Sequence, residues 1–456
     1  MRYNGCRRKG VGRRMMNTPI CDFIDKYTEN GTLRFHMPGH KGKDLIGFEK
    51  YDITEINGAD SLYEASGIIA ESEKNASALF GADTFYSTEG SSHCIRAMLY
   101  LLKCSGVTRI LAGRNAHKAF LSAVALLDTK IEWIYPSENE SYLSGRIDLS
   151  SLESRLSESN EKTAVYITSP DYLGNIADIK SIAEICKRFN AFLAVDNAHG
   201  AYLKFLRESL HPIDLGADIC CDSAHKTLPV ITGGAYLHIA KANTGIFSAR
   251  ARDALSLFGS TSPSYLILRS LDAANKYLSD GFDKKLGIFI EKVNEVKKRL
   301  CSHGYKLLGN EELKVVINTK EFGYYGQELG RIINERNIEY EFCDRDHLVL
   351  MLAPIMEFCE LEIMADSLCS VERRKAITEA VPSIPRSEAI LTPREAIFAE
   401  SERIGSSRSE GRILTQFNIS CPPAVPIAVC GERINSDAVK CFEYYGITEI
   451  TVKKLM

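Results

Sequence analysis

The sequence lacks the long apolar runs that a membrane span would need. No uninterrupted apolar stretch approaches the roughly 18–20 residues that cross a bilayer. It also has little net charge, since 56 Lys and Arg against 59 Asp and Glu leave a formal charge of -3, and this balance favours neither a nucleic-acid nor a membrane partner. Its 14 cysteines include no CxxC pair and no zinc-type spacing. A chain of this length does not need disulfides, so reduced thiols in a cytoplasmic setting are expected.

The overall composition is that of an ordinary globular protein. Hydrophobic residues make up 45% of the 456 residues and charged residues 25%, which suits two or three domains. The stretch from Met1 to Arg14 is the exception, because all of its charged side chains are basic. No apolar segment follows it, so a secretory signal is not expected. A targeting peptide, a disordered tail and an upstream extension before a start at Met15 or Met16 all stay open.

Strand and helix patterns alternate through the first half of the chain. After a short helix at Asn17 to Tyr27, apolar strands are expected at Thr84 to Ser87, Arg109 to Ala112, Ile131 to Tyr135, Ala164 to Thr168 and Phe192 to Asp196. Helices are expected at Ser66 to Phe80, Ala116 to Leu127, Leu149 to Leu156 and Ile179 to Phe189. This alternation predicts an α/β fold with a mostly parallel central sheet covered by helices on both faces. Ligands of such folds bind beyond the carboxyl ends of the strands.

The second half is predicted to add a smaller α+β unit. The strand Ala235 to Ile239 comes too soon after Lys226 for a helical crossover, so it is expected to run antiparallel. Helices at Ser260 to Asp280 and Phe282 to Leu300 lead to strands at Lys314 to Ile317, Ile338 to Phe342 and His347 to Leu352, around a helix from Gly326 to Arg336. Prolines then mark a linker, and a helix at Thr392 to Ile404 and a proline-glycine segment at Cys421 to Glu432 follow.

The stretch Ser223-Ala224-His225-Lys226-Thr227 holds the first candidate site residues. It follows the largely apolar run from Ala217 to Cys221. A lysine just past a buried strand is partly desolvated, which lets its amine be neutral and nucleophilic, as a Schiff-base lysine must be. Ser223 and His225 beside it are placed to hold a phosphate, and pyridoxal phosphate offers both an aldehyde and a phosphate. Taken alone, the motif fits an ordinary surface lysine as well.

A second phosphate-binding feature is expected at Gly90, Ser91 and Ser92. These residues open a helix directly after a strand, where free backbone N–H groups and the positive end of the helix dipole favour an anion. A plain helix N-cap made by one of the two serines is the alternative reading.

Strand ends supply the remaining candidates. Asp196 ends an apolar strand, and a carboxylate there is tolerated when a cation such as a protonated pyridine pairs with it. A helix cap or a structural salt bridge is the alternative for Asp196. His199 follows three residues later. His117 comes after the strand Arg109 to Ala112 and is a candidate either for the site or for a helix cap.

Taken in order, these motifs resemble the fold-type-I pyridoxal-phosphate (PLP) enzymes, and more closely the bacterial Orn/Lys/Arg decarboxylase family. The resemblance runs from about Asn17 to the proline-glycine segment and is closest to the shorter members, because no receiver-like domain precedes it. It implies four parts: an N-terminal tail and arm (1–45), a PLP-binding major domain (46–290), a small α+β domain (291–385) and a C-terminal decarboxylase domain (386–456). The segments that carry it are FHMPGHKG (35–42), the stretch from Asp52, STEGSS (87–92), RNAHKAF (114–120), VDNAHGAY (195–202), DSAHKTLP (222–229) and STSPSYLI (260–267).

The resemblance also implies a role for each candidate. Lys226 would hold the cofactor aldehyde and later move protons, and Asp196 would pair with the pyridinium nitrogen. His117 would stack on the ring, and His199 would lie near its phenolic oxygen. Thr261 or Ser262 is the candidate to reach the phosphate of a partner subunit, since the family builds its sites at a dimer interface. The phosphate of the chain's own cofactor would be held by Gly90, Ser91, Ser92, Ser223 and His225.

The implied activity is decarboxylation of arginine, lysine or ornithine to the corresponding amine and CO2, feeding polyamine synthesis, by a cytoplasmic homodimer or higher homo-oligomer. Glu432 and the acidic residues from Asp52 to Glu64 are candidates to hold the side-chain cation of such a substrate. Some positions depart from the family: Ala424 and Cys430 stand where glycine and proline are usual, and Asn197, Glu89 and Ala119 also differ. Another PLP reaction, such as transamination or elimination, and a non-catalytic relative stay open as alternatives.

Overall fold

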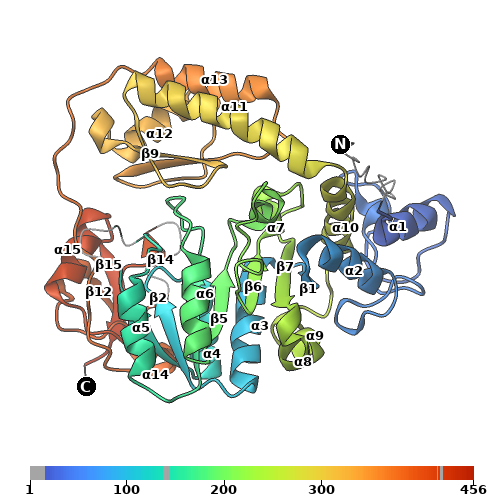
Figure 1. Ribbon diagram of the computed structural model, residues 1–456, viewed down its shortest axis with the longest axis horizontal. Helices are drawn as coiled ribbons and strands as arrows, with labels where there is room; N and C mark the ends of the chain where they lie inside the picture. Colours follow the sequence, from blue (N-terminus) through green and yellow to red (C-terminus); the bar gives the residue numbers. More distant parts are fainter. Residues whose placement is uncertain (1–15, 137–140, 142, 418–419, 422–424, 456) are drawn as a thin grey trace, which may run out of the picture.

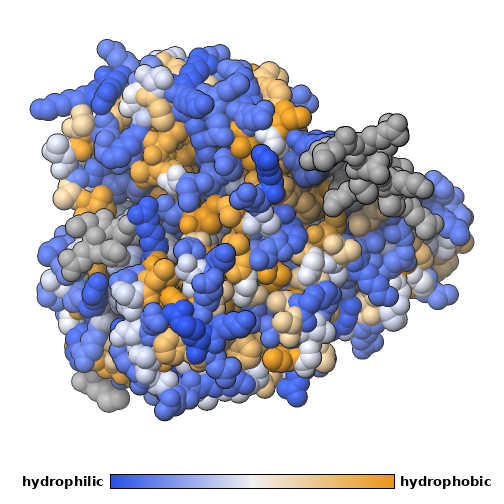
Figure 2. Space-filling model, viewed as in Figure 1, coloured by the Kyte–Doolittle hydropathy of each residue, from blue (hydrophilic) through white to orange (hydrophobic). Residues whose placement is uncertain are grey.

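The computed structural model of the chain describes residues 16–136, 141, 143–417, 420–421 and 425–455. The basic stretch Met1 to Arg14 and the departure at Ala424 lie outside the described residues. Figure 1 shows a large sheet with its helices, a smaller sheet under α11 and α13, and a C-terminal region beside both. On the face drawn in Figure 2, patches of apolar side chains break up a largely hydrophilic surface. Within the described ranges, every helix is too short or too polar to cross a bilayer.

The large sheet has the strand order β1-β7-β6-β5-β4-β2-β3. Strand β7 is antiparallel to both of its neighbours, as the short connection predicted, and the strands from β6 to β3 are parallel. The predicted α/β fold is therefore confirmed. The strands are β1 (Ala82–Ser87), β2 (Arg109–Gly113), β3 (Lys130–Ile134), β4 (Thr163–Thr168), β5 (Phe192–Asp196), β6 (Ile219–Asp222) and β7 (Ala235–Ala240).

Helices cover both faces of this sheet because successive strand residues point to opposite sides. Ile110 and Ala112 pack under α3 (Gly90–Cys104), α4 (Lys118–Leu127) and α9 (Ala251–Phe258). Leu111, between them, packs under α5 (Leu149–Ser157) and α6 (Ile179–Arg188). A third cluster covers the β1–β7 end with α1 (Pro19–Glu29), α2 (Ile68–Phe80) and α10 (Tyr265–Ser279). The short helices α7 (Ala224–Thr227) and α8 (Thr244–Phe247) flank β7.

The smaller sheet is antiparallel throughout, with the order β10-β11-β9-β8. The expected strand Ile338 to Phe342 is wrong for most of its length. The backbone N–H of Ile338 donates to the Ile333 carbonyl in the turn that ends α12, so hydrogen bonding to β11 starts only at Glu341, whose N–H donates to the Val349 carbonyl. The elements are α11 (Phe282–His303), β8 (Lys306–Leu308), β9 (Lys314–Asn318), α12 (Gly326–Asn334), β10 (Phe342–Cys343), β11 (His347–Met351) and α13 (Phe358–Cys369).

The C-terminal region contains another correction to the sequence reading. The helix expected from Thr392 to Ile404 ends at Phe398, and Ser401–Gly405 forms strand β12, which pairs with β15 (Glu449–Lys453). Pairing with a segment this far along the chain overrides the helical pattern. The other elements are α14 (Pro393–Phe398), β13 (Ser420–Cys421), β14 (Val425–Pro426) and α15 (Ser436–Tyr444). Val425, Ile427 and Phe442 share one buried cluster with Val316 and Val349 of the smaller sheet.

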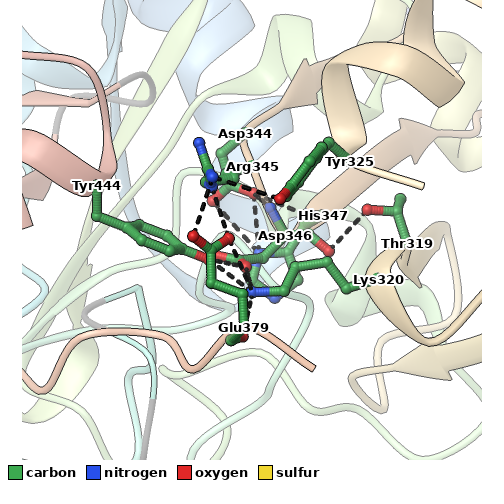
Figure 3. A network of polar contacts seen from close by, with 9 residues as sticks. All are labelled: Thr319, Lys320, Tyr325, Asp344, Arg345, Asp346, His347, Glu379 and Tyr444. Carbon is green, nitrogen blue, oxygen red and sulfur yellow. Dashed lines mark hydrogen bonds and ion pairs between the residues drawn. The ribbon is translucent and has the colours of Figure 1, made fainter. Parts of the chain in front are cut away.

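A buried polar network also joins the C-terminal region to the smaller sheet (Figure 3). Lys320 Nζ lies 2.9 Å from Asp346 Oδ1 and donates to the hydroxyl oxygen of Tyr444 at 2.7 Å. The Tyr444 hydroxyl in turn donates to Asp346 Oδ1 at 2.5 Å. At the edge of the network, Arg345 pairs with Glu379 of the extended segment that follows α13. Tyr444 at the end of α15 is therefore fixed to a neutralised ion pair of the smaller sheet.

Candidate active site

A cavity of about 320 Å³ opens at the carboxyl ends of β4, β5 and β6. This is the edge where the parallel-sheet pattern predicted a ligand. The structure brings to its wall the nine residues expected to hold the cofactor: Gly90, Ser91, Ser92, His117, Asp196, His199, Ser223, His225 and Lys226. Their individual roles stay predictions, and the contacts around each of them show what the residue is able to do.

Lys226 lies in the short helix α7, and its side chain is partly buried. Its Nζ is 3.0 Å from His199 Nε2. Burial lowers the pKa of the Lys226 amine, while the charges of Asp196 and Glu341 oppose that shift. Burial and the charge of Lys226 hold the pKa of His199 well below 6.5, so the partner of the amine is a neutral imidazole. An amine with a lowered pKa is what a nucleophilic lysine requires.

Asp196 ends β5 as a buried carboxylate, 2% exposed. The Ala198 N–H donates to Oδ1 at 3.2 Å, and the Tyr166 hydroxyl donates to Oδ2 at 3.4 Å. Among the described residues it forms no ion pair, and burial raises the pKa of its carboxyl while the charge of Lys226 opposes that shift. A buried carboxylate without a cation is costly. The protonated ring nitrogen of PLP would supply that cation, so these residues fit the cofactor.

His117 is a helix cap that also lies at the cavity, and its role toward a cofactor stays a prediction. It is the N-cap of α4, where its Nδ1 accepts from the Ala119 N–H at 3.1 Å, and its ring also lines the cavity. Burial, and then the charge of Lys226, lower the pKa of His117 to about 3. The capping bond fixes the tautomer and the plane of a neutral imidazole, which is the geometry that stacking on a cofactor ring would need.

The expected phosphate set lies where α3 begins. Ser223 Oγ donates to Ser91 Oγ at 2.7 Å, and His225 Nδ1 donates to the Gly234 carbonyl at 2.9 Å. Gly90 contributes differently from the expectation, because its N–H donates to the Gly233 carbonyl at 2.7 Å and is already used. Its φ of +74° still favours glycine. Ser91 and Ser92 keep the helix N-terminal position that suits an anion.

Sequence reasoning missed several residues of the cavity wall. Thr168 ends β4, and Tyr172 follows it in the next loop. The Tyr172 ring lies edge-on to His199, with centroids 4.9 Å apart. The Thr168 hydroxyl oxygen and His199 Nδ1 are buried without a hydrogen-bond partner among the described residues. The strand-end rule that selected Asp196 would have found Thr168 if it had been applied to β4.

The acidic residues proposed for the substrate cation have other contacts. Glu432 is buried beside Arg114, with Nη2–Oε2 at 3.7 Å, and accepts from the Val429 N–H at 2.8 Å. Asp52 pairs with His40 at 3.1 Å. Asp60 accepts from a series of backbone N–H groups, which lower the pKa of its carboxyl in spite of partial burial. None of these three side chains lines the cavity.

Comparison with known proteins decides the family. The family model described as Orn/Lys/Arg decarboxylase, major domain, matches residues 18–318. The chain belongs to the Orn/Lys/Arg decarboxylase family. The predicted family, the fold-type-I fold and the enzyme class, a PLP-dependent decarboxylase, are confirmed.

Relatives of this decarboxylase extend over almost its whole length. It is 29% identical over 457 residues to an arginine decarboxylase of Bacillus subtilis, covering 92% of each chain. It is 28% identical to an arginine decarboxylase of Halalkalibacterium halodurans, again covering 92% of each. The solved constitutive lysine decarboxylase of Escherichia coli has the same fold, with a TM-score of 0.74 and 17% identity over 96% of this chain and 82% of that chain. For lysine decarboxylase A of Pseudomonas aeruginosa the TM-score is 0.77 and the identity 18%, over 94% of this chain and 76% of that chain.

The homodimer expected of the decarboxylase stays a prediction. Thr261 and Ser262, the candidates to reach a partner's phosphate, are exposed. Large apolar side chains of the N-terminal arm are also exposed, with Phe35 at 93% and Leu45 at 82%. Such side chains suit a contact between copies of the chain.

Behind the cavity of the decarboxylase, a buried carboxylate joins the segments that carry Asp196 and Lys226. Asp222 Oδ1 accepts from Asn197 Nδ2 at 2.7 Å, and Oδ2 accepts from His211 Nε2 and His238 Nε2, each at 3.1 Å. Despite burial, the two histidines hold the pKa of the Asp222 carboxyl below 3.8. The amide at Asn197 suits this partner, because an acidic side chain there would face a second carboxylate. The asparagine that departs from the family pattern at position 197 therefore has a suitable partner in Asp222.

We expect Asp222→Ala to lower the free energy of unfolding of the decarboxylase by about 3–5 kcal/mol, since it leaves buried donors without their acceptor. Urea unfolding at pH 7 measures the loss, with the exposed Asp253→Ala as the matched control. A carboxyl whose pKa is lowered by folding stabilises fully above about pH 4, and this stabilisation is lost as the pH falls further. The difference in the free energy of unfolding between the wild type and Asp222→Ala should therefore become smaller below about pH 4. Equal urea midpoints for the two variants at pH 7 would contradict this prediction.

Proposed function

We propose that this enzyme decarboxylates a basic amino acid, with arginine the first candidate, and that the amine product feeds polyamine synthesis. The observation that carries the proposal is the cavity itself, in which a partly buried lysine with a lowered pKa stands near a buried carboxylate that forms no ion pair among the described residues. The names of the curated relatives, arginine decarboxylases over most of their length, support arginine among the basic substrates.

The chain's own residues have separable tasks in this reaction. Bound pyridoxal phosphate supplies the electron sink for the electrons of the Cα–carboxylate bond. Asp196 stabilises positive charge at the ring nitrogen and so keeps the sink effective. Lys226 Nζ, held 3.0 Å from His199 Nε2, is placed to bring a proton to Cα after CO2 leaves. Leu143, Pro170 and Val425 give the cavity an apolar wall, and a substrate carboxylate bound against it would be weakly solvated.

The test is to supply arginine, lysine and ornithine in turn to purified protein with added PLP. We expect CO2 and one dominant amine: agmatine, cadaverine or putrescine. The same protein stripped of cofactor is the control and should release neither product. Bound cofactor with no CO2 from any of the three substrates would overturn the proposal in favour of another PLP reaction. Failure to bind the cofactor at all would favour a non-catalytic relative.

A further inference from the structure

A basic substrate needs an anionic group near the cavity, and the acidic side chains proposed from the sequence do not line it. Other buried carboxylates near the site are also engaged. Glu311 pairs with Lys314 at 3.1 Å, and Asp171 accepts from Asn175 and from the Gly145 N–H. Asp196 is matched to the cofactor nitrogen. Glu89 lines the cavity beside the phosphate set, where its carboxylate already accepts from the Ser260 N–H.

Tyr172 leads from the cavity to a different carboxylate. Its ring forms part of the cavity wall and lies edge-on to His199, the partner of Lys226. Its other ring neighbour is Phe342 at the start of β10, with centroids 5.5 Å apart. The Tyr172 hydroxyl donates to Glu341 Oε1 at 3.3 Å. The carboxylate of Glu341, on the smaller sheet, is therefore one side chain away from the cavity wall.

Glu341 is an exposed residue whose charge has no counterion among the residues that the structure describes. Within the described ranges it forms no ion pair, and its Oε2 accepts no hydrogen bond. The carboxylate acts electrostatically on the cavity. After burial, which lowers the pKa of Lys226, the opposing charges are first Asp196 and then Glu341. Burial lowers the pKa of His225, and the charge of Glu341 is one of the influences that oppose this shift.

We propose that Glu341 is the specificity-determining carboxylate that receives the distal cation of a basic substrate, and that Tyr172 is the residue that positions it. This inference rests on the proposed function. Glu341 Oε1 stays with the Tyr172 hydroxyl, and Oε2 is available for an ammonium or guanidinium group. The smaller sheet thus recognises the far end of the substrate, while the large sheet holds the reacting end.

The expected effect is on substrate binding more than on chemistry. Glu341→Gln keeps the shape and the Tyr172 contact but removes the charge. We expect KM for the preferred basic substrate to rise about tenfold, the loss that follows removal of one charge-assisted hydrogen bond, with kcat nearly unchanged. Tyr172→Phe keeps the negative charge of Glu341 but removes the hydrogen bond that holds its carboxylate in place. We therefore expect a smaller rise in KM than for Glu341→Gln.

The matched control is Glu339→Gln, which removes an exposed charge two residues away on the same segment. A second readout is calorimetric binding of the product amine to the holoenzyme. The Kd of the amine should rise together with KM in Glu341→Gln and stay at the wild-type value in Glu339→Gln. Binding of citrulline, an uncharged analogue of arginine, should be unaffected by the substitution.

The outcomes separate this inference from the proposed function. If the wild-type enzyme makes no amine from any basic substrate, the proposed function fails. If the wild type is active but Glu341→Gln has the KM and Kd of Glu339→Gln, the function stands and the assignment of Glu341 is overturned. If Glu341→Gln loses kcat with KM unchanged, Glu341 is not the residue that binds the cation.

Discussion

Lys226→Ala is expected to abolish turnover and covalent attachment of the cofactor together. The amine of Lys226 is buried, its pKa is lowered by that burial, and its neighbour at 3.0 Å is a neutral imidazole. Among the described residues no other lysine lines the cavity, so no second amine is available to hold the cofactor aldehyde. Loss of both roles should reduce CO2 release by more than about 10³-fold.

Covalent attachment is measured independently of activity. Borohydride reduction of the PLP-loaded protein, followed by digestion and mass spectrometry, should place the cofactor on the peptide that contains Lys226 and leave the variant unlabelled. The exposed Lys187→Ala is the control for a lost lysine charge and should behave as wild type. Full activity in Lys226→Ala, or labelling of another peptide, would remove the basis of the cofactor assignment.

Asp196→Asn should retain part of the cofactor and lose most of the activity. The asparagine keeps the size of the side chain and can still accept from the Ala198 N–H, but it carries no charge. A ring nitrogen that is no longer held protonated accepts electrons poorly, so kcat should fall by about 10²–10³-fold, the scale of losing one preorganised electrostatic contact.

Two measurements are needed for the Asp196 variant. The amount of PLP released by alkali reports cofactor content, and kcat per bound cofactor reports the chemistry. The exposed Asp253→Asn is the matched control. An Asp196→Asn enzyme with wild-type kcat per cofactor would show that the carboxylate serves the local Ala198 contact alone, which is the helix-cap alternative.

Strand-end logic explains why the centre of the site was predictable. The carboxyl ends of parallel strands meet at one edge, so polar residues directly after β5 and β6 converge whatever the loops do. Asp196, His199, Ser223 and Lys226 all follow this rule. His117 was ambiguous in sequence because one imidazole can cap a helix through Nδ1 and also face the cavity.

The parts that sequence could not supply depend on contacts between distant segments. Strand β12 forms because β15 pairs with it, and the local sequence of residues 401–405 does not predict that pairing. Glu432 has the right chemistry for a substrate cation, yet Arg114 neutralises it from the other side of the fold. In the sequence Glu341 looks like an ordinary surface glutamate. Only its hydrogen bond with Tyr172, far earlier in the chain, shows that it lies near the cavity.

The C-terminal region is held at two separate points. At one, Arg114 donates to the Pro426 and Ile427 carbonyls, next to Val425 of the cavity wall. At the other, Tyr444 is fixed to the Lys320–Asp346 pair of the smaller sheet (Figure 3). A chimaera that grafts this region from another family member must therefore also carry over its partners outside the region, Arg114, Lys320 and Asp346, as a set. Recombination boundaries near residue 386 would otherwise separate Tyr444 from the ion pair and Glu432 from Arg114.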